Sequence, residues 1–166
     1  MKKPDLIDEF DYEGDVISVE WYDVQNKSEI PNLQWQQIYV IGNFENRVPL
    51  VKYHEKENNL PGGHVEQGRV TRRCYASCEV QEELNMKIIS WAPLGYQRLS
   101  NPGNKDVVFQ FRVFAKLQKI GEFTSDLGGS VVGHKLVALK DVNTLIKYGS
   151  VGNRLIEKCT KYFNQP

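Results

Sequence analysis

Hydrophobic and polar residues alternate along several segments of this chain, which predicts a protein rich in β-strands. The most regular alternation runs from Val107 to Leu117. A strand is also expected at 87–92, and the turn sequence SNPGNK at 100–105 predicts that the two strands form a hairpin. Pro93 and Gly95 mark either the irregular end of the first strand or a bulge in it.

Four more segments are expected to be strands. Residues 17–22 alternate with the period of a half-buried strand. Residues 35–41 are apolar on both alternating faces, as in a strand that is covered on two sides. Residues 48–54 and 135–139 complete the set. Together these strands predict a sheet in the centre of the molecule.

The hydrophobic spacing is that of a helix in the segment 71–84. Ala76, Val80 and Leu84 repeat every four residues, and the segment contains no Gly or Pro. These residues form the inward stripe of an amphipathic helix. The sequence Pro-Gly-Gly at 61–63 precedes the helix and allows the backbone to turn tightly and approach a ligand closely.

Two further helices are expected near the C-terminus. Asp141 can cap a short helix that ends at Lys147, and Ser150 can cap the last helix. The inward stripe of the last helix consists of Val151, Leu155 and Cys159. The connection 118–133 before these helices is Gly-rich and long, so we expect it to border a functional site.

Three acidic residues occupy the polar face of the first helix. Glu79, Glu82 and Glu83 stand at i, i+3 and i+4, so their carboxylates project over one helical turn. Their mutual repulsion is unfavourable without a cation, and clustered hard oxygen ligands suit Mg²⁺ or Mn²⁺. The alternative is an ordinary solvated helix whose acids face water.

The stretch from Gly62 to Met86 resembles the signature of the Nudix hydrolases. Gly63 matches the first glycine of the family pattern. The second half matches in register if one extra residue is allowed between Arg69 and Cys78, and its matching residues are Glu79, Val80, Glu82, Glu83 and Met86.

Three positions depart from the family pattern. Arg69 stands where the family has its first Glu, Cys78 where it has Arg, and Asn85 where it has the Gly that ends the helix. Asn tolerates the left-handed conformation required there. The lost Glu and Arg are partners in the family, so their joint absence predicts a rebuilt brace in which Arg69 pairs with Glu66 or with a helix glutamate.

The order of the expected elements also looks like the Nudix fold. We therefore expect an α/β protein with an α/β/α sandwich, in which a mixed β-sheet lies between helices. The resemblance implies hydrolysis of the pyrophosphate bond of a nucleoside diphosphate linked to another moiety, with Mg²⁺ or Mn²⁺ as cofactor.

The resemblance also implies the residues of the site. The metal ligands that it implies are Glu79, Glu82, Glu83 and the carbonyl of Gly63. One of these glutamates would help to deprotonate the attacking water. Many members of the family use a further carboxylate from a later loop, which Glu122 or Asp126 could supply here.

Composition narrows the classes of partner. The 21 basic and 21 acidic residues give a formal net charge of zero, which argues against a polynucleotide partner. The family resemblance implies a small nucleotide-type molecule as the partner. No apolar run approaches a membrane span. A homodimer is left open.

The 166 residues suit one domain, for which we expect bounds of 16–166, after a polar N-terminal arm at 1–15. Three cysteines without framework spacing favour a reducing compartment, and the acidic N-terminus lacks the apolar core of a signal peptide. The cytoplasm is therefore the expected location.

Other chemistry-bearing residues have ordinary explanations. Cys74 and Cys78 lie at i and i+4, a spacing that could hold a metal, but two semi-buried thiols are favoured. The histidines are scattered, at His54, His64 and His134. Four aromatic residues on strands could stack a nucleobase or belong to the core, namely Tyr39, Tyr53, Tyr96 and Phe109.

Two other classes of function compete with a hydrolase. A Nudix-like binding or sensor domain could keep the fold and lose turnover, which the replaced Glu and Arg favour. A structural interaction domain would bind neither metal nor nucleotide. Metal binding and product formation distinguish the three classes.

Overall fold

A six-stranded mixed sheet forms the centre of the protein. The computed structural model describes residues 2–54, 58–65, 72–103, 106–126, 129 and 131–163, with side chains from residue 76 onward in the first long helix. In order across the sheet, the strands are β1 (Leu6–Tyr12), β2 (Asp15–Asp23), β6 (Met86–Ser100), β7 (Val107–Lys119), β3 (Gln37–Asn43) and β5 (Gly62–His64). Strands β3 and β7 pair in parallel, and the other neighbours are antiparallel.

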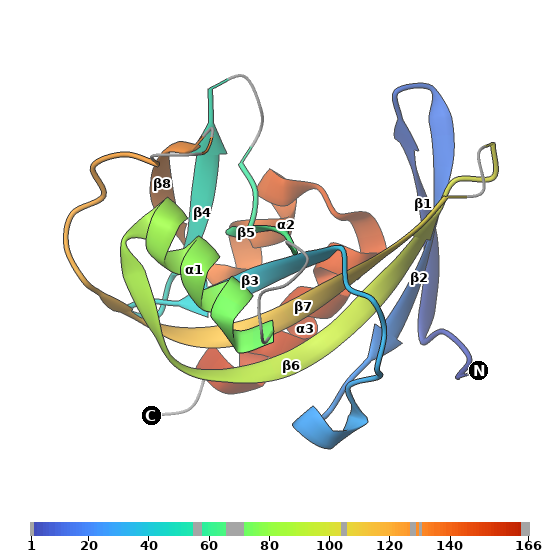
Figure 1. The fold of residues 1–166 in the computed structure, drawn as a ribbon, viewed down its shortest axis with the longest axis horizontal. Coiled ribbons are helices and arrows are strands. Elements are labelled where there is room, and N and C mark those ends of the chain that lie inside the picture. The colour runs from blue at the N-terminus through green and yellow to red at the C-terminus, as the bar shows by residue number, and fades with distance from the viewer. Residues whose placement is uncertain are drawn as a thin grey trace.

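The remaining elements cover this sheet. Strands β4 (Val48–Tyr53) and β8 (Val131–Val137) form a separate antiparallel pair. The helices are α1 (Arg72–Leu84), α2 (Val142–Ile146) and α3 (Gly149–Phe163), with short 3-10 turns at Lys27–Glu29 and Leu139–Asp141. Helix α1 lies in front of the long strands β6 and β7, and α3 lies behind them (Figure 1). The expected α/β/α sandwich with a mixed sheet is therefore confirmed.

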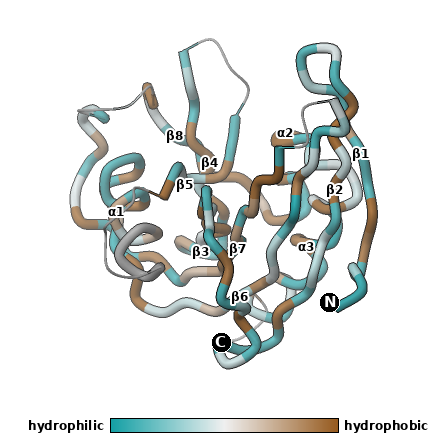
Figure 2. The backbone as a smooth tube through the Cα atoms, turned by 45° about the vertical axis from the view of Figure 1, so that its right-hand side comes forward, coloured by the Kyte–Doolittle hydropathy of each residue, from teal (hydrophilic) through white to brown (hydrophobic). Residues whose placement is uncertain are grey.

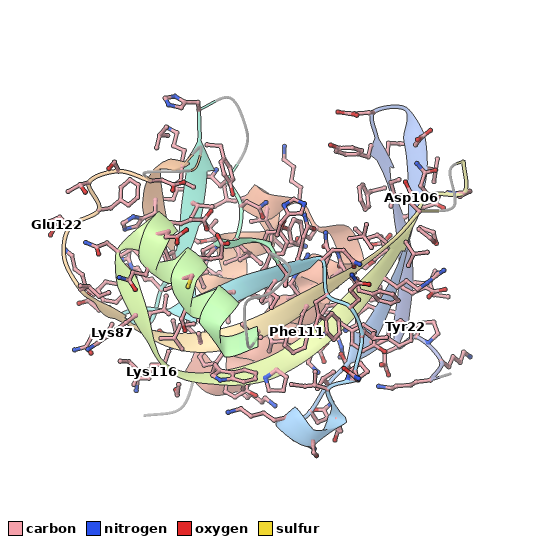
Figure 3. All side chains as sticks on the ribbon, in the orientation of Figure 1. Tyr22, Lys87, Asp106, Phe111, Lys116 and Glu122 are labelled. Atoms are coloured by element: carbon pink, nitrogen blue, oxygen red, sulfur yellow. The ribbon has the colours of Figure 1, made fainter. Side chains whose placement is uncertain are left out.

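Each face of the sheet carries its own hydrophobic core. The core under α1 joins Ala76, Val80 and Leu84 of the helix to Ile38 and Phe111 of the sheet. Phe111 lies near the middle of the molecule (Figure 3).

The core on the α3 side contains the predicted stripe of Val151, Leu155 and Cys159, all of which are buried. Hydrophobic and hydrophilic residues mix along the outer strand β1, as Figure 2 shows. The alternating pattern of β3, with Ile38 inward on one face and Ile41 on the other, agrees with a strand covered on both sides.

The central hairpin is as predicted. Strands β6 and β7 pair from Met86 with Lys119 to Ser100 with Val107. The irregularity predicted at Pro93 and Gly95 is a register shift, so β6 continues through a bulge instead of ending there.

Three features of the strands differ from the sequence-based expectations. The polar segment 1–15 contributes β1, which pairs with β2 from Leu6 opposite Trp21 to Tyr12 opposite Asp15. Backbone hydrogen bonds hold this edge strand, so it needs no hydrophobic pattern. The strand β5 is only three residues long, so no hydrophobic pattern in the sequence predicted it. The strand β8 begins at Val131, four residues before the strand predicted at 135–139.

The predicted helix caps were also wrong in detail. Asp141 precedes α2, but its side chain makes no capping hydrogen bond. Ser150 lies inside α3, and its backbone N–H and its hydroxyl donate to the carboxylate of Asp8 on β1. A tertiary contact from β1 thus supplies the acceptor at the start of α3. Among the described helices, none is long and apolar enough to cross a membrane.

A buried ion network fastens α3 to strand β2. Asp23 is 8% exposed and accepts a 2.7 Å hydrogen bond from Trp21 Nε1. Arg154 also donates to this carboxylate, and Lys158 Nζ lies 3.2 Å from Asp23 Oδ1. Burial raises the pKa of Asp23, but the donors Arg154 and Trp21 and the charge of Lys158 outweigh it and lower the pKa to about 2.

This network predicts a loss of stability in acid. Because the folded-state pKa of Asp23 lies below its ordinary value of 3.8, its contribution is fully present above about pH 4 and is lost as the pH falls through about 2. The shift corresponds to about 2 kcal/mol of unfolding free energy. Urea titrations between pH 6 and pH 2 should show this loss, and Asp23→Asn should remove that part of the pH dependence. The exposed Asp11→Asn should leave the curve unchanged.

Candidate functional site

Two glycines bring the edge strand β5 against helix α1. Gly62 pairs with Tyr39 of β3 and has a φ of +145°, a backbone conformation that residues other than glycine rarely adopt. A Cβ on Gly62 would lie 2.2 Å from the carbonyl oxygen of Ile38. A Cβ on Gly63 would lie 3.0 Å from Glu79 Oε1, so the Gly63 backbone lies directly against that carboxylate.

Glu83 is the buried centre of this contact. It is 7% exposed, and its Oε2 accepts a 2.8 Å hydrogen bond from the Gly62 N–H. Burial raises the pKa of Glu83 to about 8; the Gly62 N–H opposes the shift, and the charges of Glu79, Asp126 and Glu82 add to it. The other three carboxylates thus lie close enough to disfavour ionisation of Glu83, and a bound cation would favour its ionised form.

A cavity of about 680 Å³ lies between α1 and the connection that follows β7. Its walls are Cys78, Gln81, Glu82 and Asn85 of the helix end and residues 123–126 of the connection. The connection thus reaches the acidic helix, and the expectation that it borders a functional site stays a prediction. Figure 1 shows it arching beside α1 before it enters β8.

Asn85 ties the connection to the helix end. Its φ of +52° is the left-handed conformation predicted for the position of the family Gly. Its Nδ2 donates a 2.8 Å hydrogen bond to the carbonyl of Glu122, and its own carbonyl accepts a 3.0 Å bond from the Ile120 N–H. Asn85 therefore does more than end the helix, because a glycine would lack the side-chain bond.

The two loop acids lie in different environments. Asp126 lines the cavity, is close enough to raise the pKa of Glu83, and accepts a 3.3 Å bond from the Val131 N–H. Glu122 is largely exposed on the outside of the loop (Figure 3). It pairs with Lys119, whose hydrogen bond and charge lower the pKa of Glu122. The geometry therefore favours Asp126 over Glu122 as the site carboxylate.

Carboxylate oxygens are ligands that suit a hard divalent cation, but the carboxylates of this site that the structure describes do not converge on one point. Glu79 and Glu83 both adjoin the Gly62–Gly63 backbone, whereas Glu82 is exposed beside the cavity. In the part of the chain that the structure describes, no three His, Cys, Asp or Glu side chains form a group that could hold a metal ion. Binding of an ion would draw Glu82 or Asp126 toward the other two.

Several predicted features fall outside the described residues. Glu66 and Arg69 are among them, so the rebuilt brace stays a prediction. The side chain of Cys74 is also outside, and the proposed thiol pair with Cys78 is untested. Cys78 itself is partly buried and lines the cavity at the position of the family Arg.

The three histidines stay apart. His54 is exposed, and His64 Nε2 lies 3.1 Å from Gln37 Nε2. His134 packs edge-on against Phe123, with ring centroids 6.1 Å apart, and burial lowers its pKa. This contact connects β8 to the loop that carries Asp126.

The four candidate aromatic residues divide between the site and the core. Tyr96 stacks on Tyr22, with ring centroids 4.7 Å apart, and Phe109 packs against Trp35. Burial raises the pKa of Tyr39 and of Tyr53. The charges of Glu83 and Glu79 add to both shifts, which indicates that the two phenols lie near these glutamates.

Sequence reasoning missed a second cavity on the α3 side of the sheet. It measures about 610 Å³, and Tyr39, Arg112 and Tyr148 are among its lining residues. Arg112 looked like an ordinary polar position of an alternating strand. The available signal was that Val108 and Phe114 share the strand face of Arg112, so both faces carry apolar residues, as in a strand covered on two sides.

Comparison with solved structures identifies proteins of the same fold. One is a variant of the pyrophosphohydrolase BsRppH from Bacillus subtilis, with 20% identity, coverage of 93% of this chain and 96% of that chain, and a TM-score of 0.68. A Nudix hydrolase from Nitrosomonas europaea has 15% identity, covers 78% and 90%, and has a TM-score of 0.61. The Nudix domain of Shewanella oneidensis NrtR, complexed with ADP ribose, has 13% identity, 82% and 96% coverage, and a TM-score of 0.59. No family model and no curated protein matches the chain.

The Gly62 conformation predicts a sensitive position. Gly62→Ala should lower the unfolding free energy by roughly 2–4 kcal/mol, because the new methyl group meets the Ile38 carbonyl in a strained conformation. Chemical denaturation measures this change. Gly133→Ala is the matched strand control, since a Cβ at Gly133 meets nothing within 4 Å. Equal stabilities of the two variants would contradict the close approach.

Proposed function

We propose that this chain, which has the fold of the Nudix hydrolases, is a metal-dependent hydrolase that cleaves the pyrophosphate bond of a nucleoside diphosphate linked to another moiety. The observation that carries the proposal is the buried carboxylate of Glu83, held by the Gly62 N–H among the charges of Glu79, Glu82 and Asp126. Proteins of the same fold include a pyrophosphohydrolase and an ADP-ribose pyrophosphatase.

Mg²⁺ or Mn²⁺ is the proposed cofactor. Glu79 and Glu83 would bind it together with the Gly63 carbonyl, and Glu82 or Asp126 would complete the oxygen set. A bound ion of this kind neutralises charge on phosphate oxygens and lowers the pKa of a water ligand.

The chain's own groups orient the substrate and move the proton. The bare backbone at Gly62 and Gly63 lets the phosphates approach the main chain, where a side chain would obstruct them. Glu83 Oε2 is already engaged by the Gly62 N–H. Glu82 and Asp126 border the open cavity, so either can accept the proton of the attacking water.

A nucleotide-binding or sensor domain without turnover is the second candidate. It is favoured by the replacement of the two box residues by Arg69 and Cys78, and by the absence of a ready three-ligand group among the described residues. This candidate predicts ligand-dependent thermal stabilisation without products, whereas a hydrolase forms phosphate-bearing products.

The first test combines the substrate panel with substitutions in the site. Wild-type protein with Mg²⁺ or Mn²⁺ should hydrolyse at least one nucleoside diphosphate derivative. Glu83→Gln and Glu82→Gln should each reduce turnover by about 100-fold or more and weaken cation binding in calorimetry. In EDTA, Glu83→Gln should not lower the melting temperature, because the amide oxygen still accepts from Gly62 and the carboxyl that it replaces is costly to ionise at this buried position. Unchanged cation affinity in both variants would reject the ligand assignment.

The second test compares the two loop acids. Asp126→Asn should lower turnover at least about tenfold, because Asp126 faces the acidic helix across the cavity. Glu122→Gln is the matched control on the same loop and should change turnover little. Initial rates and melting temperatures of both variants separate an effect on the reaction from an effect on folding. A larger loss in the Glu122 variant would reverse the assignment.

A further inference from the structure

Arg112 is a buried cation without an anionic partner among the described residues. It lies on β7, is 1% exposed, and its Nη2 donates a 2.7 Å hydrogen bond to Gln110 Oε1. Its Nε and Nη1 are also buried and have no hydrogen-bond partner there. Desolvation by burial lowers its pKa, and the guanidinium nonetheless stays a donor-only group. A side chain in this state is costly for a free protein and suits one that receives acceptors from a ligand.

The surroundings of Arg112 are those of a site for a flat ring. Its Cζ lies 4.5 Å from the centroid of Tyr39 and 5.5 Å from that of Tyr148, and all three residues line the 610 Å³ cavity. Gln97 and Gln110 line the same cavity and hydrogen-bond to each other. Aromatic walls with a few converging polar groups are typical of pockets for small planar ligands.

The charges of the cavity argue against a second phosphate group as the occupant. Arg112 and Lys147 are opposed by the carboxylates of Asp8, Glu9 and Asp11, which also line it. These three acids make an additional anion unfavourable, whereas a neutral ring with carbonyl or ring-nitrogen acceptors meets the free N–H groups of Arg112 without that repulsion.

The cavity lies on the face of the sheet opposite α1, but at Tyr39 it reaches the strand that neighbours β5. Tyr39 pairs in register with both Arg112 on one side and Gly62 on the other, and Gly62 holds Glu83. A ring bound against Tyr39 therefore lies one strand away from the backbone at which the phosphates are proposed to bind. This places the two ends of one nucleotide in two adjoining regions.

We propose that this cavity binds the nucleobase of the substrate and selects a base with an oxo group over one with an amino group at the edge facing Arg112. The inference rests on the proposed function and names the base subsite of the same substrate. Guanine presents two acceptors on its N7 and O6 edge, whereas adenine presents a donor in place of O6, which would face the donors of Arg112. Because Nε and Nη1 are covered in the free protein, a covering ring moves on binding. Tyr148 is that ring: it belongs to the connection between α2 and α3, and its hydroxyl gives up its hydrogen bond to Asn59 Oδ1 when the ring moves, while Tyr39 is held within the sheet.

The test uses two ligands that differ at the purine 6-position. Inosine monophosphate carries an oxo group there and adenosine monophosphate an amino group. In calorimetry with EDTA, the wild-type protein should bind inosine monophosphate about tenfold more tightly. Arg112→Met should abolish the difference and leave the melting temperature of the free protein unchanged or higher, because an apolar side chain replaces an unpaired buried charge. Arg98→Met, on the opposite face of the sheet and paired with Glu20, should keep the preference.

Three binding results would overturn the inference. They are equal affinity of the wild-type protein for the two ligands, no binding of either, and retention of the preference in Arg112→Met. A melting temperature that falls in both Arg112→Met and Arg112→Lys would assign Arg112 to folding and also overturn it. The binding experiment needs neither divalent ions nor hydrolysis, so its result is independent of the hydrolysis assay. A failed base preference would not contradict the proposed hydrolase activity, and an absence of hydrolysis would not contradict the base preference.

Discussion

The hydrogen bond from the Gly62 N–H to the buried carboxylate of Glu83 joins the edge of the sheet to helix α1. The bond forms because Gly62 and Gly63 lack side chains, so that β5 can lie between β3 and the helix. With β5 in this position, Glu79 meets the backbone of Gly63 and the next helical turn presents Glu82 to the cavity. The acidic site thus depends on a backbone contact that any larger residue would prevent.

The two faces of the sheet divide the chemistry of the protein. The α1 side gathers carboxylates, and the α3 side carries a buried guanidinium between two tyrosine rings. A formal net charge of zero over the whole chain conceals this separation. The two environments come close at Tyr39, because this residue pairs with Gly62 of β5 on one side and with Arg112 of β7 on the other. A ligand with an anionic end and a planar end would match this arrangement.

Buried charges serve different purposes in the structure. Asp23 is met by Trp21, Arg154 and Lys158, so its burial fastens α3 to the sheet. Glu83 and Arg112 are incompletely compensated within the described residues, since like charges surround the first and two nitrogens of the second lack partners. A compensated charge contributes to stability, whereas an uncompensated one is explained by a ligand that completes it.

The sequence by itself determined the helix α1, the hairpin of β6 and β7 and the sandwich architecture. Their signals are local, because periodic burial repeats along one segment and Asn85 suits a left-handed helix end wherever the helix packs. It also singled out the acidic residues, whose order along one helix fixes their spacing. Only the tertiary structure decided that β1 and β5 are strands, that Asp126 and not Glu122 approaches Glu83, and that Arg112 is buried. Those features depend on which backbone atoms and charges meet across segments far apart in the chain, and no periodicity within a segment encodes such a meeting.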